Sequence, residues 1–231
     1  MNVNVKFVTD DKCCAYSKYG IKIIDNEKFI KPVKGARKEK IDLVKYIDNE
    51  MLDILNIGKK VYFKEKVNDR EILDYADKYG MFGLILEQIL EDTKPNSKFD
   101  VRGMTIFSKE YVESFELIRL YAGKLYEFLY NIDKKSDRIR VPAILTDRNT
   151  EINFVFNIEN DVTVKVISLK QAIDLYFTLQ ISKPVRTLKI CKYCNKAFFA
   201  NNIKANYCCH SCKNKANVYK CRAKARNGGV E

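Results

Sequence analysis

Two pairs of cysteines near the C-terminal end constrain the fold of this chain more than any other feature. Two residues separate Cys191 from Cys194, a thirteen-residue loop leads to Cys208, and three residues separate Cys208 from Cys212. Two thiolate pairs joined by a loop are typical of tetrahedral zinc. The segment has few large aliphatic residues, and structural zinc adds roughly 10–16 kcal/mol of apparent binding energy to the folding of finger peptides. The spacing therefore predicts a structural Zn²⁺ site.

The choice of ligands on the second side of the metal leaves alternatives. Residues four apart lie on one face of a helix, and a helix N-terminus favours thiolate charge, so we favour Cys208 with Cys212. Cys209 could pair with Cys212 instead, or His210, the only histidine, could replace a cysteine. Four cysteines close the coordination shell and leave no position for a catalytic water. Asn195 follows the first pair and tolerates the left-handed backbone that such a turn needs.

A helix rich in lysine and arginine is predicted from Cys212 to a stop at residues 228–229. A short strand is predicted at 196–200, with a turn at 201–202, before this helix. At 3.6 residues per turn, one stripe of the helix faces the metal and this hairpin, and cations line both flanks. The stripe consists of Cys212, Ala216, Tyr219 and Ala223, one flank of Lys213, Lys220 and Lys224, and the other of Lys215, Arg222 and Arg226.

The charge of the chain is concentrated in the same region. Residues 183–231 contain twelve lysines and arginines and one acidic residue, a net charge of +11, whereas residues 1–182 are nearly neutral at +1. Such asymmetry predicts a polyanionic partner, usually nucleic acid. The predicted contacts are Lys196, Lys204, Lys213, Asn214, Lys215, Lys220, Arg222, Lys224 and Arg226.

A family resemblance is carried by the pattern Cys191-x-x-Cys194-x-x-x-Phe198, followed by Tyr207-Cys208-x-x-x-Cys212-x-Asn214-Lys215 and the basic helix. This pattern resembles the CGNR-type zinc fingers and related treble-clef fingers of bacterial and phage proteins. Their Cys-Gly-Asn-Arg element corresponds to residues 212–215, where Cys212 and Asn214 are retained. The resemblance is confined to the region 186–226. It implies a treble-clef finger behind a larger N-terminal domain, in a regulator of transcription that binds DNA.

Two other functions stay open beside a DNA-binding regulator. Aromatic side chains can stack on unpaired bases, so RNA binding through Tyr193, Phe199 or Tyr207 is one alternative. A finger that docks an acidic protein partner is the other. The resemblance favours DNA over RNA.

Residues 1–182 are predicted to form one α+β domain that senses a signal or mediates assembly, as a homodimer or with a protein partner. Alternating and helical hydrophobic patterns predict its elements. Strands are predicted at 3–7, 19–24 and 61–63, and a hairpin at 152–166. Helices are predicted at 41–55 with a stop at Gly58, at 69–90 with a break at Gly80 or Gly83, at 111–130 and at 168–181. A loop is predicted at 91–103. The domain boundary is placed at 182–184, the finger at 186–226 and a flexible tail at 227–231.

Catalysis is not expected. One histidine in the whole chain leaves almost no room for histidine-based acid–base chemistry, and no glycine-rich phosphate loop is present. Cys13 and Cys14 are interpreted as incidental thiols. The N-terminus lacks the apolar block of a signal peptide, and no apolar run reaches the roughly 18–20 residues that span a bilayer. We therefore expect a cytoplasmic protein that is not an enzyme and makes no membrane contact.

Overall fold

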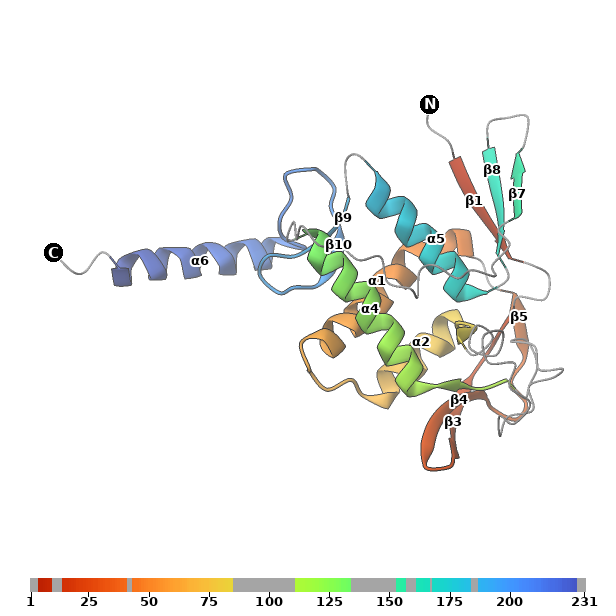
Figure 1. The fold of residues 1–231 in the computed structure, drawn as a ribbon. Helices are drawn as coiled ribbons and strands as arrows, with labels where there is room; N and C mark the ends of the chain where they lie inside the picture. Colours follow the sequence, from red (N-terminus) through yellow and green to blue (C-terminus); the bar gives the residue numbers. More distant parts are fainter. Residues whose placement is uncertain are drawn as a thin grey trace.

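The computed structural model describes residues 4–9, 14–40, 43–84, 111–133, 153–156, 161–166, 168–183 and 187–227. Across these residues helices and small sheets are mixed, so the fold is α+β, as predicted. Figure 1 shows a central group of helices with most of the strands at one end and the C-terminal helix projecting from the other. No helix in the described ranges has the length and hydrophobicity needed to cross a bilayer.

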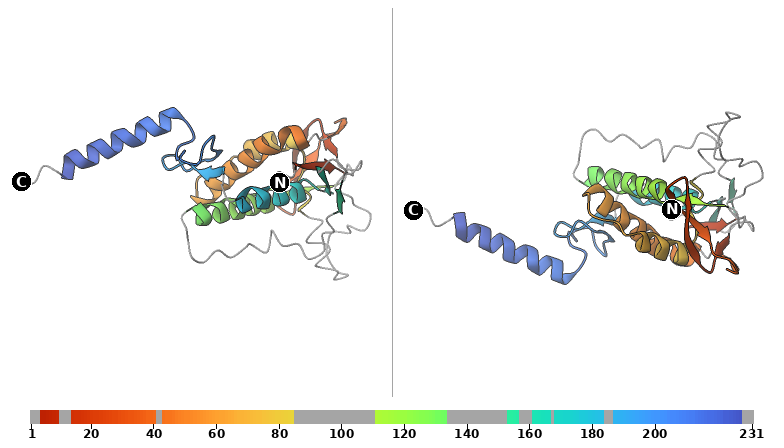
Figure 2. Two further views of the ribbon diagram at one scale, coloured as in Figure 1. Left: turned by 90° about the horizontal axis from the view of Figure 1, so that it is seen from above. Right: turned by 90° about the horizontal axis from the view of Figure 1, so that it is seen from below.

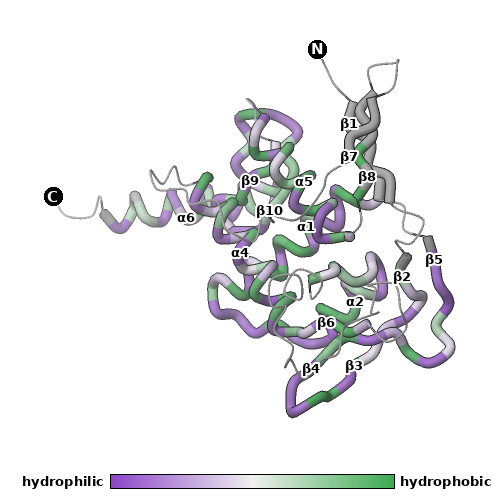
Figure 3. Tube along the Cα trace, turned by 45° about the vertical axis from the view of Figure 1, so that its right-hand side comes forward, coloured by the Kyte–Doolittle hydropathy of each residue, from purple (hydrophilic) through white to green (hydrophobic). Residues whose placement is uncertain are grey.

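The central group consists of α1 (Leu43–Tyr62), α2 (Asp69–Tyr79), α4 (Phe115–Asp133) and α5 (Leu169–Ser182). Figure 3 shows green hydrophobic stretches along α1, α4 and α5. The helical stripe predicted at 111–130 supplies much of the core, which includes the buried side chains of Phe115, Ile118, Tyr121, Leu125 and Leu129. The apolar repeat read from the sequence is therefore a packing surface.

Gly58 lies inside α1, so the predicted helix stop at Gly58 and the predicted strand at 61–63 are wrong. A Cβ atom at Gly58 would lie 2.0 Å from the carbonyl oxygen of Ala122 in α4. The missing side chain therefore lets two helix backbones touch. Burial of Ile54 and Leu55 in the same helix outweighs the roughly 1 kcal/mol that an internal glycine costs relative to alanine.

Gly80 ends α2 and is one of the two breaks, Gly80 or Gly83, that the sequence predicted. Its φ is +94°, and its N–H donates to the carbonyl oxygen of Ala76. The remainder of the predicted helix at 85–90 and the predicted loop at 91–103 lie outside the described residues, as do Cys13, the proposed turn at 157–160 and the tail from 228 onward.

One sheet joins the N-terminal strand to the predicted hairpin. Its order is β1 (Asn4–Thr9), β8 (Asp161–Val166) and β7 (Asn153–Phe156), with β1 parallel to β8 and β7 antiparallel to it. Helix α5 then begins behind Ser168, whose Oγ accepts from the N–H of Gln171 at 3.1 Å. The alternating strands and the helix start are both confirmed.

The second three-stranded sheet has the order β3 (Tyr19–Ile24), β4 (Glu27–Pro32) and β6 (Glu113–Ser114). Asp25 and Asn26, both with positive φ, form the turn between β3 and β4, as two-residue hairpins prefer. Strand β2 (Cys14–Tyr16) precedes β3 in the sequence, strand β5 (Lys38–Lys40) follows β4, and the two pair antiparallel with each other. The predicted strand at 19–24 is confirmed.

A buried carboxylate ties β6 to the segment after α2. Glu113 accepts from the backbone N–H groups of Phe82, Gly83 and Leu84 and from the hydroxyl of Tyr111. Burial raises the pKa of Glu113, although these four donors oppose the shift. The side chain is fully enclosed and serves the fold.

Candidate metal centre and basic helix

A short hairpin positions the first cysteine pair. Strands β9 (Leu188–Ile190) and β10 (Ala197–Phe199) are hydrogen-bonded antiparallel, and Cys191 and Cys194 lie in the turn between them. The side chains of Leu188, Ile190 and Ala197 are buried in the same core as α1 and α4. The main core therefore extends past the predicted boundary at 182–184 and includes strands β9 and β10 at the base of the candidate metal module, residues 187–227.

The turn between these strands is a tight knuckle. The N–H of Asn195 donates to the carbonyl oxygen of Cys191 at 2.9 Å, and the N–H of Cys191 donates to the carbonyl oxygen of Lys196 at 2.9 Å. Asn195 has φ +57°, the left-handed conformation that the sequence predicted for it. The hydroxyl of Tyr126 in α4 donates to the carbonyl oxygen of Asn195 at 2.6 Å, which anchors the knuckle to the body of the protein, the part of the chain before residue 183.

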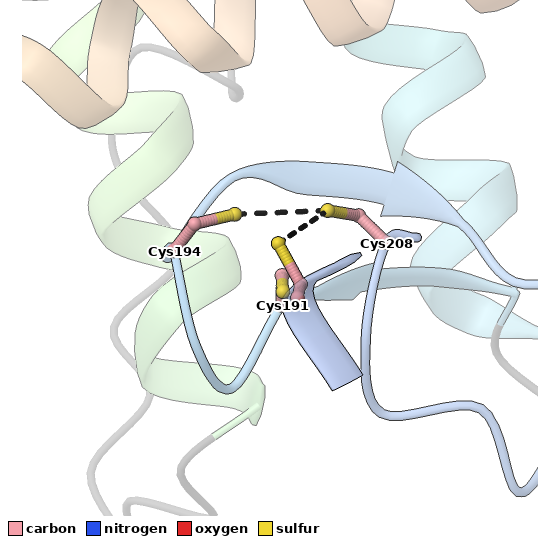
Figure 4. Close-up of side chains that lie close together, drawn as sticks. Cys191, Cys194 and Cys208 are labelled. Carbon is pink, nitrogen blue, oxygen red and sulfur yellow. Dashed lines mark hydrogen bonds between the residues drawn. The ribbon is translucent and has the colours of Figure 1, made fainter. Parts of the chain in front are cut away.

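The four predicted cysteines converge. Their sulfur atoms all lie within 4.8 Å of one another, and Figure 4 shows the side chains of Cys191, Cys194 and Cys208 pointing together. The sulfur of Cys208 is 3.6 Å from the sulfurs of both Cys194 and Cys212. With metal–sulfur bonds of about 2.3 Å, neighbouring sulfurs of a tetrahedral site are about 3.8 Å apart. The four thiols can therefore hold a metal ion, and the two separations of 3.6 Å are close to those of tetrahedral coordination.

The alternative ligands lie outside this cluster. Cys209 is exposed, with its sulfur 4.0 Å from that of Cys208. His210 is also exposed, and its Nδ1 lies 3.2 Å from the Nδ2 of Asn214. The structure thus gathers the cysteine set that the sequence favoured.

The electrostatics of the cluster suit a cation. Burial acts to raise the pKa of Cys191, but N–H groups of the surrounding backbone donate to its sulfur and bring the value down to about 7. Burial raises the pKa of Cys212 to about 12. Burial also raises the pKa of Cys208, and hydrogen bonds and charge interactions with the neighbouring cysteine sulfurs raise it further. Four thiolates so close together repel one another unless a metal ion balances their charge. A divalent cation at the centre removes that penalty by binding the deprotonated sulfurs.

Helix α6 (His210–Asn227) supplies Cys212 from its first turns and then leaves the body. Its 18 residues span about 27 Å at 1.5 Å per residue. Figures 1 and 2 show it projecting past the metal module with no other element alongside. The predicted packed stripe is correct at its start and in part at Tyr219, whose ring centroid lies 6.0 Å from that of Tyr193 in the knuckle. Cys212 and Ala216 are half-buried, whereas Ala223 is exposed and Tyr219 is 61% exposed.

The projecting helix carries a high density of positive charge. Six lysines and arginines and no acidic residue occur between its ends. The side chains of Lys213, Lys215, Lys220, Arg222 and Arg226 are exposed, and Lys224 lies on the same helix. Lys196 in the knuckle and Lys204 in the loop before α6 are exposed as well. Asn214 is exposed beside His210.

The aromatic residues proposed for base stacking are placed less favourably. Tyr193, Phe199 and Tyr207 are all half-buried: Tyr193 and Tyr207 pack around the cysteines and Phe199 packs against the main core. Tyr219 is the exposed ring, and the sequence pattern assigned it to the packed stripe. Its exposure follows from the direction in which α6 leaves the knuckle, which helical periodicity does not encode.

Removing the anchor of the knuckle tests how strongly the body supports the metal. The Tyr126→Phe variant loses the hydrogen bond to Asn195 and leaves a part-buried carbonyl unpaired, which costs about 1–3 kcal/mol. We expect metal transfer to a competing chelator at a concentration about tenfold lower than the wild type needs. Tyr62→Phe is the control, because it removes a hydroxyl from an adjoining ring, 5.6 Å from Tyr126 between centroids. Equal metal retention by both variants would contradict the anchoring role.

Comparison of the chain with protein-family models, with curated proteins and with solved structures found no match.

Proposed function

We propose that the chain is a zinc-dependent nucleic-acid-binding protein, with DNA as the favoured partner and regulation of transcription as its role. The observation that carries the proposal is α6, an exposed helix with six cations and no acidic residue, held at one end by a four-cysteine cluster. Zn²⁺ is the proposed metal because tetrahedral sulfur sites suit it and four cysteines close its coordination shell. The metal is structural, and the proposal includes no reaction.

Repulsion within α6 supports a polyanionic partner. Lys220 and Lys224 are four residues apart, as are Arg222 and Arg226, and like charges at this spacing destabilise a helix by about 0.2–0.5 kcal/mol per pair. Phosphates placed along the helix relieve this repulsion, and release of their counterions drives binding. A basic helix also fits the major groove of DNA, where lysine and arginine recognise guanine and Asn214 or Asn217 is suited to adenine.

The preference for DNA over RNA rests on the resemblance of the cysteine pattern to CGNR-type fingers. The body, residues 1–182, is proposed to sense a signal or to mediate assembly. Several of its acidic residues pair with cations of the body itself, as with Asp69, which binds Lys28 and Arg119 at 2.6 and 2.7 Å.

Salt dependence tests the proposal. The triple variant Lys220→Ala, Arg222→Ala and Arg226→Ala should bind a random-sequence duplex more weakly and respond less to salt. Each lost phosphate contact takes about 0.9 off the slope of log affinity against log salt concentration, so the slope should become shallower by about 2–3. Fluorescence anisotropy across a series of salt concentrations measures both quantities.

The matched control removes three exposed cations from the body instead, through Lys22→Ala, Lys34→Ala and Lys38→Ala. It changes the net charge by the same amount and should keep the wild-type slope. The proposal fails if the wild type binds neither duplex nor single-stranded nucleic acid, if its binding is insensitive to salt, or if the two triple variants lose affinity equally. A stable protein partner without nucleic acid would favour the adaptor function instead.

A further inference from the structure

An aromatic pair lies where α6 leaves the metal module. The rings of Tyr193 and Tyr219 have their centroids 6.0 Å apart and their planes at 34°. Tyr193 belongs to the knuckle and is half-buried against the cysteine cluster, whereas Tyr219 belongs to α6 and is 61% exposed. Tyr193 therefore supports one side of Tyr219, which the metal module holds in place while much of its ring faces solvent.

Cations flank Tyr219 along the helix. Lys215 lies four residues before it and Arg222 three residues after it, and residues at these spacings are neighbours on a helix surface, with Cβ atoms about 5–6 Å apart. Ala216 and Ala223, at the opposite spacings, are too small to cover the ring. An exposed aromatic face between two exposed cations is thus built into this side of α6.

This combination matches the chemistry of an unpaired nucleotide. A base stacks on an aromatic face whatever its identity, and the adjoining phosphates bind lysine and arginine. The bases of an intact duplex are stacked on one another, so their faces are not available to a side chain. A duplex can therefore engage the cations of α6 but leaves the ring of Tyr219 without a partner.

We propose that Tyr219, supported by Tyr193, stacks on an unpaired base of a nucleic acid whose phosphates bind Lys215 and Arg222. The inference rests on the proposed function and narrows it to strands that contain unpaired bases, as in a single strand or a gapped duplex. Single-stranded DNA and single-stranded RNA share this chemistry, and separate probes distinguish them.

The test compares four probes of random sequence: an intact duplex, the same duplex with a central single-stranded gap, single-stranded DNA and single-stranded RNA. Tyr219→Ala should weaken binding to the gapped and single-stranded probes about 10- to 100-fold, the range typical of one stacked base. Binding to the intact duplex should stay within about twofold of the wild type, because the phosphate contacts remain. If affinity falls equally for single-stranded DNA and single-stranded RNA, the site accepts both nucleic acids. If affinity falls for only one of them, the site is specific for that nucleic acid.

Two further variants separate stacking from bulk. Tyr219→Phe keeps the aromatic face and should retain wild-type affinity, whereas Tyr219→Leu keeps an apolar side chain and should behave like Tyr219→Ala. Bound metal, measured for each variant, establishes that the module is folded. The inference is overturned if Tyr219→Ala affects the intact and gapped duplexes equally or affects neither. In that case the wild type still binds with a steep salt dependence and the proposed function stands; absence of wild-type binding to every probe removes both.

Discussion

The Cys191→Ser variant is expected to lose stoichiometric zinc, the order of α6 and part of the stability of the body. Cys191 is fully buried and shares the knuckle with the carbonyl oxygen that Tyr126 binds. Zinc contributes on the order of 10 kcal/mol of apparent binding energy to small modules. The strands around the knuckle belong to the main core, so loss of even about 4 kcal/mol should lower the melting temperature by roughly 8–16 °C for a chain of this size.

Metal content, thermal unfolding and hydrogen exchange of the α6 amides measure the three losses. Cys221→Ser is the matched control, because Cys221 is exposed on α6 and stands outside the cluster. Cys209→Ser is the sharper comparison, since its sulfur lies only 4.0 Å from that of Cys208. Both controls should retain metal and melt as the wild type does. A metal-free wild type, or an ordered α6 in Cys191→Ser, would remove the basis of the proposed function.

The Gly58→Ala variant is expected to be destabilised by more than about 3 kcal/mol, above the usual range for overpacking. The added Cβ atom would lie 2.0 Å from the oxygen and 2.6 Å from the carbon of the Ala122 carbonyl group. Both atoms belong to the backbone of α4, so the two helices must move apart. The gain of about 1 kcal/mol in helix propensity offsets only part of this cost.

Gly123→Ala, on α4, is the control for that substitution. Its Cβ atom would lie 2.9 Å from Cγ1 of Val61, a methyl group that can move with its side chain. Here the gain in helix propensity nearly balances the cost of the close contact, so we expect the free energy of unfolding to change by no more than about 1 kcal/mol. Urea unfolding compares the two variants, and similar midpoints for both would show that the backbones do not touch at Gly58.

Local patterns predicted most of the elements whose causes are local. Alternating residues predicted β3 and the β7–β8 hairpin, Ser168 predicted the start of α5, and cysteine spacing predicted the sulfur cluster. The errors arise where a distant segment decides. Gly58 resembles a helix stop when only its neighbours in the sequence are considered, and its role becomes clear only from the packing of α4 against it. Nothing near Glu113 in the sequence indicates that its carboxylate accepts from N–H groups some thirty residues earlier. The zinc, the partner and the role remain predictions.

The direction of α6 is the part of the candidate site that periodicity could not predict. A stripe of Ala216, Tyr219 and Ala223 looks like a packing face when only spacing is considered. In the structure the helix leaves the knuckle and the stripe meets solvent after its first turns. The same residues therefore contribute an accessible ring where a buried one was expected.

The shared core has a consequence for finding what the body recognises. Because Leu188, Ile190 and Ala197 pack with α1 and α4, any binding of a metal ion at the four cysteines would be coupled to folding of the body. Linkage is reciprocal, so a small molecule that binds the metal-loaded protein more tightly than the metal-free protein must raise the affinity for the metal by the same factor. A smaller fraction of the ion transferred to a coloured chelator at equilibrium thus gives a screen for unknown effectors, with the four-cysteine cluster as the reporter.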